Sequence, residues 1–220
     1  PEPPVGNPWM TYYSVRLAWD NEAASIVRSC LGQAAGFRME RFEAPDYVEV
    51  SDHDSRLLIL PHGRPYHRRS GHRMLDSLLI VEGEDARAFD LTLEFDQAFP
   101  MRSATEILCP VLQKTTTGKT PASATSGWIL GLSAKNVVAA RTRVVGESTG
   151  GDSTAGTAIT MLLQETEGRS AACLIKTARA PKTARVRLAT GETVRGLQVT
   201  AEGVRIEFSR FQMKEVELTF

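Results

Sequence analysis

The strongest constraint on the fold is a short-range alternation of apolar and polar residues that recurs along the chain. Each alternating run is rich in β-branched and aromatic side chains. This period is typical of half-buried β-strands, because successive side chains point to opposite faces of a strand. The predicted strands are residues 12–19, 47–50, 56–60, 76–81, 88–95, 128–132, 137–145, 158–164, 172–177, 184–188, 194–200, 204–208 and 214–220.

These runs predict an all-β fold with few or no helices. Long amphipathic patterns that could form crossover helices are nearly absent, so the strands should pair antiparallel in two packed sheets. Tight turns at residues 190–192 and 201–203 indicate a meander of hairpins in the last third of the chain. Residues 21–31 fit either a helix capped by Asp20 or an alternating strand. The predicted fold is one large antiparallel β-sandwich.

The predicted domain organisation follows from composition. Residues 1–10 read as a proline-rich linker, and residues 11–220 as the sandwich. An alternative division gives a larger sandwich of residues 11–145 and a small β-subdomain of residues 157–220. Residues 114–127 and 146–157 are polar, small-residue stretches that predict long loops. Because the chain begins with Pro1 in a proline-rich stretch, we expect upstream sequence that carries the chemistry.

Charge and cysteine content exclude several classes of partner. The 26 basic residues balance the 26 acidic residues, so no net field would attract nucleic acid or an anionic membrane. No apolar run is long enough to cross a bilayer. Three widely separated cysteines, Cys30, Cys109 and Cys173, lack metal-binding spacing and are expected to be buried free thiols. Unpaired cysteines point weakly to the cytoplasm.

The densest polar segment is residues 62–76, which hold three histidines, four arginines and one aspartate. Several guanidiniums cannot be buried unpaired, so we expect this segment to form a loop that is solvated or occupied by a ligand. Arginine forks suit ligand oxygens, and a tyrosine ring can stack on a sugar. In the alternative, Asp76, Glu82 and Glu84 pair with the arginines as a structural tie. The candidate ligand-binding residues are Tyr66, His67, Arg68, Arg69, His72 and Asp76.

No metal site or catalytic residue is predicted in these 220 residues. The spacing of His62, His67 and His72 places successive rings on different faces of a strand or helix. No nucleophile motif is present. The acids that could serve glycoside chemistry are expected on the solvated surface: Glu94, Asp96, Glu165 and Glu167. Three tryptophans could stack on sugars, and Trp128 is expected in the core instead.

Four segments resemble a known family in their order and spacing. Residues 57–79 resemble a strand, a His-Arg-Arg loop and a second strand. Residues 128–138 end in an Asn-Val-Val turn, residues 165–169 read Glu-Thr-Glu-Gly-Arg, and residues 211–220 form a closing strand. Together these segments resemble the C-terminal β-sandwich of the glycoside hydrolase family 38 α-mannosidases, whose fold is similar to galactose mutarotase.

The resemblance implies a non-catalytic part of a larger carbohydrate-active enzyme. Catalysis would lie in an N-terminal α/β barrel that holds zinc, so this chain itself is expected to carry no cofactor. The implied partners are that catalytic domain and a carbohydrate. In the eukaryotic members, acidic and glycine residues follow the two arginines of the His-Arg-Arg loop. Here the residues after them are Ser70, Gly71, His72 and Arg73, which departs from that pattern. The alternatives are a stand-alone carbohydrate-binding module and, from the enzyme class, a mutarotase-like epimerase using His67 or His72 with a glutamate.

Overall fold

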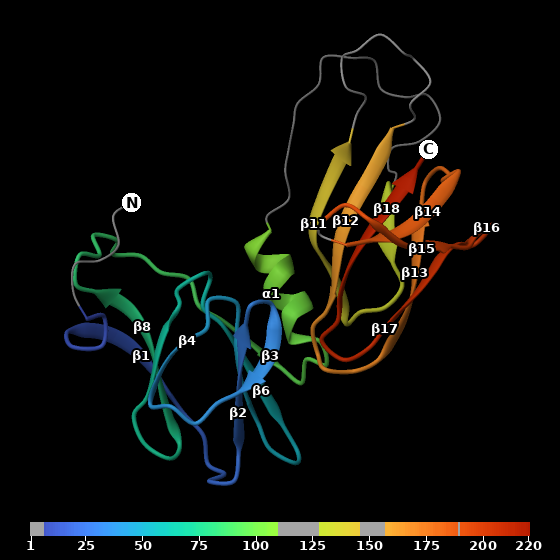
Figure 1. Cartoon of the computed structure of the whole chain (residues 1–220). Coiled ribbons are helices and arrows are strands. Elements are labelled where there is room, and N and C mark those ends of the chain that lie inside the picture. Colours follow the sequence, from blue (N-terminus) through green and yellow to red (C-terminus); the bar gives the residue numbers. More distant parts are fainter. Residues whose placement is uncertain (1–6, 110–127, 146–156, 189) are drawn as a thin grey trace, which may run out of the picture. The chain divides into compact units, whose positions relative to one another are not determined.

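The computed structural model describes residues 7–109, 128–145, 157–188 and 190–220. The chain divides into two compact units, Pro1–Val111 (unit 1) and Leu112–Phe220 (unit 2). Strands dominate both units, and the described residues contain one helix, α1 (Pro100–Leu108) (Figure 1). Every strand pair is antiparallel. The predicted all-β sandwich class is therefore confirmed.

Unit 1 contains two antiparallel sheets. The first has the strand order β1 (Tyr12–Ala18), β8 (Met74–Val81), β7 (Tyr66–Arg69) and β4 (Arg41–Glu43). The second has the order β3 (Gln33–Gly36), β2 (Ser25–Cys30), β5 (Val48–Ser51), β6 (Arg56–Leu60) and β9 (Thr92–Phe95). Since β3 and β4 follow each other in sequence but belong to different sheets, residues 37–40 carry the chain from one sheet to the other.

The core of unit 1 joins side chains of both sheets. Phe42 and Leu75 from the first sheet pack with Val48, Val50 and Ile59 from the second. Strand alternation turns the intervening residues of β6, Leu58 and Leu60, to the other face of the second sheet. There they pack with Tyr47 and with Ala104 of α1. The second sheet is therefore covered on both faces.

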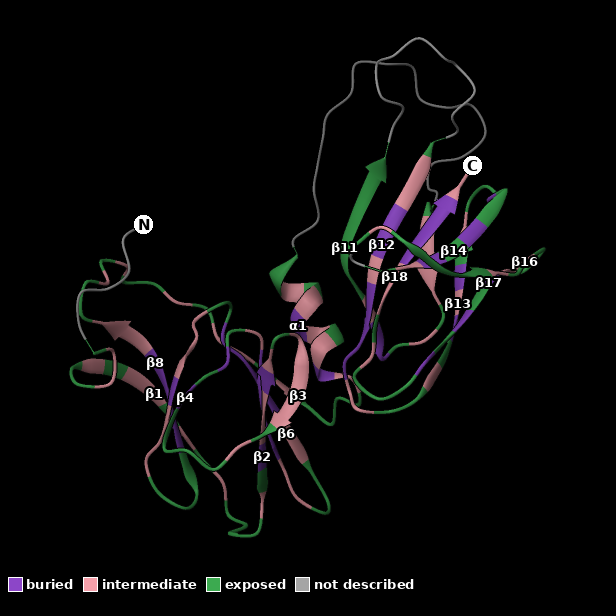
Figure 2. Ribbon diagram, in the orientation of Figure 1, coloured by how far each residue is buried: buried purple, intermediate pink, exposed green. Residues whose placement is uncertain are grey.

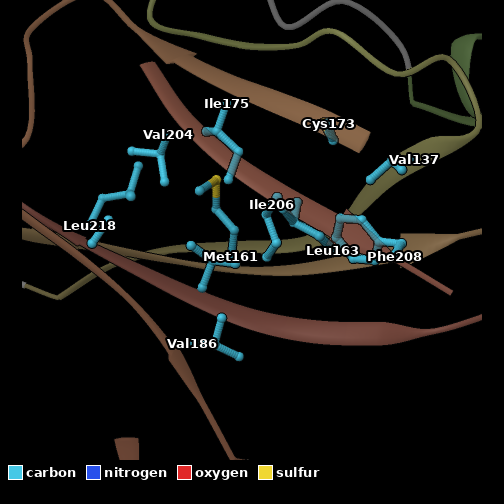
Figure 3. Close-up of a cluster of buried hydrophobic side chains, with 12 residues drawn as sticks. Val137, Met161, Leu163, Cys173, Ile175, Val186, Val204, Ile206, Phe208 and Leu218 are labelled. Carbon is cyan, nitrogen blue, oxygen red and sulfur yellow. The ribbon is translucent and has the colours of Figure 1, made fainter. Parts of the chain in front are cut away.

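Unit 2 is a sandwich of two sheets around one apolar core. One sheet has the order β10 (Leu130–Leu132), β13 (Ala171–Thr177), β17 (Gly203–Phe208) and β16 (Val199–Thr200). The other has the order β11 (Val137–Val145), β12 (Ala158–Glu165), β18 (Met213–Thr219), β14 (Thr183–Arg187) and β15 (Thr193–Leu197). Alternate residues of these strands meet in the core (Figure 3), as the sequence pattern predicts: Val137, Met161, Leu163, Cys173, Ile175, Ala184, Val186, Val204, Ile206, Phe208, Val216 and Leu218.

Most of the predicted strands are present in the structure, but β3, β4 and β7 were not predicted, and only residues 92–95 of the predicted strand 88–95 form one. Residues 56–60 and 137–145 match in full. Of the segment 21–31, which fits either a helix or a strand, residues 25–30 form strand β2. Pairing with β3 on one side and β5 on the other favours the strand over the helix. Helix α1 was not predicted. Pro100 occupies its first turn, and Met101, Ala104 and Ile107 give it an apolar face that packs on the second sheet.

Several burial predictions were wrong. Trp128 is 56% exposed and does not lie in the core. Of the three cysteines, all free, Cys173 is buried, Cys30 is partly buried and Cys109 is exposed. Cys109 directly follows α1, where no described element covers it.

The predicted domain limits stay a prediction. β11 and β12 lie on either side of the alternative boundary between residues 145 and 157, and they are paired in one sheet. All of the predicted loop 114–127, and residues 146–156 of the second loop, lie outside the described residues. The one helix found in the described part of the chain is too short and too polar to cross a membrane.

Candidate functional site

A row of charged side chains crosses the first sheet of unit 1. In the strand register, Arg16 of β1 lies opposite Asp76 of β8, Asp76 lies opposite Arg68 of β7, and Arg68 lies opposite Arg41 of β4. Directly opposed residues point to the same face of a sheet. Three arginines from strands far apart in sequence are thus aligned around one carboxylate.

Asp76 is the fixed centre of this row. Its side chain is fully buried, and its two oxygens accept hydrogen bonds from Arg16, Nε to Oδ1 at 2.7 Å and Nη2 to Oδ2 at 2.9 Å. Ser70 donates a further hydrogen bond to Oδ2. The Arg16 hydrogen bonds lower the pKa of Asp76, although burial acts to raise it. Asp76 is therefore held as a carboxylate beneath the sheet surface.

Arg68 and Arg69 are ordered by different partners. Arg68 pairs with Glu40 at 2.8 Å and donates to the Tyr12 hydroxyl at 3.2 Å. Arg69 instead donates to two backbone carbonyls of the β7–β8 turn, from Nε to Gly71 at 3.3 Å and from Nη2 to His72 at 3.2 Å. Arg69 is thus oriented by neutral acceptors that leave its charge uncompensated.

These side chains border a surface hollow of about 590 Å³, which we call the arginine hollow. It combines β1, the connection from β3 to β4, and the end of β7 with its turn. Its residues come from unit 1 alone: Tyr12, Arg16, Arg38, Glu40, Arg68, Arg69, Ser70, Gly71 and His72. Four guanidiniums therefore face one lining carboxylate, a donor-rich surface suited to ligand oxygens.

The structure brings some of the predicted site residues together and separates others. Arg68, Arg69 and His72 line the arginine hollow. Asp76 does not line it, but it pairs with Arg16, which does. Tyr66 packs edge-on against Trp9, with ring centroids 5.2 Å apart. Residues 66–69 were expected in a loop, but they form strand β7. This strand pairs with β4 on one side and β8 on the other, and both neighbours are anchored in the core, β4 by Phe42 and β8 by Leu75.

His67 is a correction, since alternation along β7 turns it away from Arg68 and into the interior. The ring is fully buried: Nε2 lies 3.1 Å from the Ala44 carbonyl oxygen and Nδ1 lies 3.1 Å from Ser77 Oγ. A carbonyl only accepts, so Nε2 carries the proton and Nδ1 accepts from Ser77. Burial lowers the pKa of His67 to about 4. His67 is therefore a neutral residue enclosed in the interior of unit 1.

The sequence offered little signal for the other residues of the hollow. Tyr12 and Arg16 occupy ordinary polar positions of an alternating strand, and Arg38 and Glu40 lie in a short connection. The alternative prediction, in which nearby acids pair with the arginines of residues 62–76, holds only in part. Glu84 pairs with Arg64 at 3.0 Å, whereas the partner of Asp76 is Arg16, 60 residues away. Only strand pairing reveals that partner.

A second buried carboxylate, Glu165 of unit 2, was expected on the surface and is fully buried. Its Oε1 accepts from Asn136 Nδ2 and from the Glu167 backbone N–H, both at 2.9 Å, and its Oε2 accepts from the Phe211 N–H at 2.8 Å. Burial acts to raise the pKa of Glu165, but the backbone hydrogen bonds from Phe211 and Glu167 make the net shift downward. This Glu165 corner is saturated by the fold itself.

The Glu165 corner also fixes two left-handed backbone positions. Gly168 has φ of 69° and Phe211 has φ of 56°. A Cβ on residue 168 would lie 2.5 Å from the Phe211 ring, so the Phe211 side chain fits only above a glycine. The Glu-Thr-Glu-Gly-Arg segment therefore has a structural role in this chain.

Comparisons with known proteins bear on the fold. No protein-family model matches the chain, and no curated protein matches it in sequence. Among solved structures, an alpha-mannosidase from Enterococcus faecalis V583 has a similar fold, with a TM-score of 0.67 and 10% sequence identity. The match covers 94% of this chain and 25% of the mannosidase chain. The resemblance to an α-mannosidase predicted from the sequence is thus confirmed at the level of the fold, and this chain spans about a quarter of that protein's length.

Proposed function

We propose that this chain is the non-catalytic β-sandwich part of an α-mannosidase-like glycoside hydrolase. The observation that carries the proposal is the fold match, which extends over nearly all of this chain and a quarter of an alpha-mannosidase. Both units are included in a match of that extent. An N-terminal catalytic domain of the same protein would be the partner of this part.

We propose further that the arginine hollow contributes to carbohydrate binding. Arg68 and Arg69 present planar donors at the surface, where Glu40 orients Arg68 and the carbonyls of the β7–β8 turn orient Arg69. Arginine forks match the oxygens of a hydroxylated ligand, and the hydroxyl of Tyr12 adds a further polar contact. Of the residues predicted from the sequence to bind ligand, Arg68, Arg69 and His72 are the ones that border this hollow.

The zinc ion implied by the family resemblance would belong to the catalytic domain. No group of three or more His, Cys, Asp or Glu side chains in the described ranges is placed to hold a metal ion. In this proposal the zinc ligands and the catalytic step belong to that domain.

The first test is the gene. We expect the reading frame upstream of Pro1 to encode an α/β barrel with His and Asp metal ligands. A stop codon shortly before Pro1 would contradict the proposal. The second test is hydrolysis of an aryl α-mannoside, for which the 220-residue chain should be inactive and the protein from the complete gene active.

The arginines are tested by Arg68→Ala combined with Arg69→Ala. Because their partners are the exposed Glu40, the half-buried Tyr12 and turn carbonyls, we expect the melting temperature of the 220-residue chain to be nearly unchanged. Hydrolysis by the full-length enzyme should fall. The matched control is Arg102→Ala with Arg143→Ala, two exposed arginines outside the hollow. A lower melting temperature in the hollow variant alone would show that Arg68 and Arg69 are a structural tie.

A stand-alone carbohydrate-binding module is the second candidate, and the exposure of Trp128 favours it. Trp128 borders a separate hollow of about 720 Å³ in unit 2, together with Lys176, Thr177 and Glu202. An exposed indole face can stack on a pyranose ring. Titration calorimetry with mannose, mannobiose and galactose tests this candidate: binding in the micromolar to low millimolar range that is lost in Trp128→Ala would favour the module.

A further inference from the structure

The arginine hollow carries more positive charge than its own acids neutralise. Arg16 is paired with Asp76 and Arg68 with Glu40, which accounts for both nearby carboxylates. Arg38 and Arg69 remain, and neither has an ion pair with another described residue. The whole chain is neutral, so this local excess is a property of the hollow and not of the protein surface in general.

Arg69 is oriented before any ligand arrives. Its Nε and Nη2 are directed by the Gly71 and His72 carbonyls, which hold the guanidinium against the turn without cancelling its charge. A guanidinium that is already ordered loses less side-chain entropy on binding than a free one. Arg69 is therefore a preorganised cation at the wall of the hollow.

Arg38 is the complementary case. It is exposed, it lies on the connection between β3 and β4, and it makes no hydrogen bond with another described residue. Its neighbour along this connection, Glu40, is occupied by Arg68. The two unpaired cations thus reach the hollow from different segments, Arg69 from the end of β7 and Arg38 from the β3–β4 connection.

We propose that the arginine hollow binds the acidic group of an anionic sugar, one that carries a phosphate, sulfate or carboxylate. Two cations without a carboxylate partner among the described residues match an oxyanion, since charge-assisted hydrogen bonds from arginine are among the strongest that such a ligand can make. A volume of about 590 Å³ is within the range of small-ligand pockets and exceeds the needs of a bare anion. The sugar part of this inference rests on the proposed function, whereas the anion part rests on the arginines.

A nucleic acid is a poorer match to the same charges. Polyanion binding requires a basic stripe that contacts several phosphates along the surface. Here the lining holds Glu40 beside its four arginines, and the whole protein has no net charge. The geometry favours a ligand with one acidic group.

The test is titration calorimetry of the 220-residue chain with mannose 6-phosphate, mannose and inorganic phosphate. We expect mannose 6-phosphate to bind at least about tenfold more tightly than mannose, and added salt to weaken it because the site is open to solvent. Arg38→Ala and Arg69→Ala should each weaken mannose 6-phosphate about tenfold. Arg143→Ala, an exposed arginine of β11, should leave binding unchanged.

The outcomes separate the two proposals. Equal affinity for mannose 6-phosphate and mannose, or an Arg38→Ala variant that binds as well as Arg143→Ala, would overturn the anionic preference. The proposed function would still stand on the gene and the hydrolysis assay. Inorganic phosphate that binds as tightly as mannose 6-phosphate would overturn the assignment to a sugar. Arg38→Ala disturbs no described contact, so it decides the matter even if Arg69→Ala lowers the melting temperature.

Discussion

Asp76 in unit 1 and Glu165 in unit 2 are both fully buried carboxylates, and they are neutralised in opposite ways. Asp76 accepts from Arg16, whose side chain is 57% exposed, and from a serine hydroxyl. Glu165 accepts from backbone N–H groups and an asparagine amide. Both pKa values are lowered, so the two groups would look alike in a search for perturbed acids.

The difference shows how to separate a structural acid from one beside a binding surface. The donors to Glu165 belong to the fold and have no access to a ligand. The principal donor to Asp76 is Arg16, an exposed cation that also lines the arginine hollow. Perturbed acids become functional candidates only when a group around them can exchange its partner. In this chain that condition is met around Asp76.

The largest expected effect is on the Glu165 corner. Glu165→Ala removes the buried acceptor that the Asn136 amide and the Phe211 and Glu167 N–H groups share, and we expect a loss of about 3 kcal/mol in the free energy of unfolding. Urea denaturation followed by circular dichroism measures it. Glu192→Ala, an exposed acid in a turn, is the control and should change stability by less than about 0.5 kcal/mol. Similar losses for Glu165→Ala and Glu192→Ala would show that the hydrogen bonds to Glu165 do not stabilise unit 2.

The second effect tests whether the interior of unit 1 keeps protons from a buried side chain, His67. His67 is neutral in the fold, with a pKa of about 4 compared with about 6.5 when unfolded, so the unfolded chain binds more protons between these values. Stability contributed by neutral His67 is complete above about pH 6.5 and is lost as the pH falls towards 4. Between pH 7 and pH 5 the loss should be about 2 kcal/mol.

The variant His67→Gln should lose this part of the pH dependence, because an amide can replace both hydrogen bonds without titrating. Urea denaturation at pH 7, 6 and 5 gives the comparison. His53→Gln, an exposed histidine, serves as the control and should follow the parent chain. A parent chain whose stability is flat from pH 7 to 5 would mean that His67 is accessible to protons in the native state.

The smallest expected effect is on Asp76, the buried carboxylate with an exposed partner. Asp76→Ala releases Arg16, which water can solvate at once because it is exposed, and we expect a loss of about 1 kcal/mol. Measured under the same conditions as Glu165→Ala, this loss shows how much less a buried carboxylate contributes when its main donor is an exposed side chain. A loss as large as that of Glu165→Ala would make the Asp76–Arg16 pair an anchor of the first sheet.

The sequence predicted most strands and the sandwich class because each follows from local alternation. Residues 137–145 and 56–60 form strands as expected, and the alternate residues of 158–164 and 204–208 fill the core of unit 2. Helix α1 was missed because its apolar face consists of three residues, a pattern too short to stand out. Trp128 was misplaced because an aromatic residue at the start of a strand carries no mark of its exposure.

The candidate site was predicted in part. Arg68, Arg69 and His72 belong to a dense charged segment that sequence reasoning finds easily. The same reasoning placed His67 with them, whereas strand β7 turns it inward. Tyr12, Arg16, Arg38 and Glu40 had no signal, because they lie in other segments and join the site only through pairing between β1, β8, β7 and β4.

The sequence by itself determined that this chain forms short antiparallel strands around apolar cores, since alternation is a local property that fixes which residues must be buried. The tertiary structure decided which charges meet. Strand register placed Arg16 on Asp76 across 60 residues, and among the described residues Arg38 and Arg69 have no acidic partner. Electrostatic partnership depends on distances in space, and no spacing along a chain encodes them.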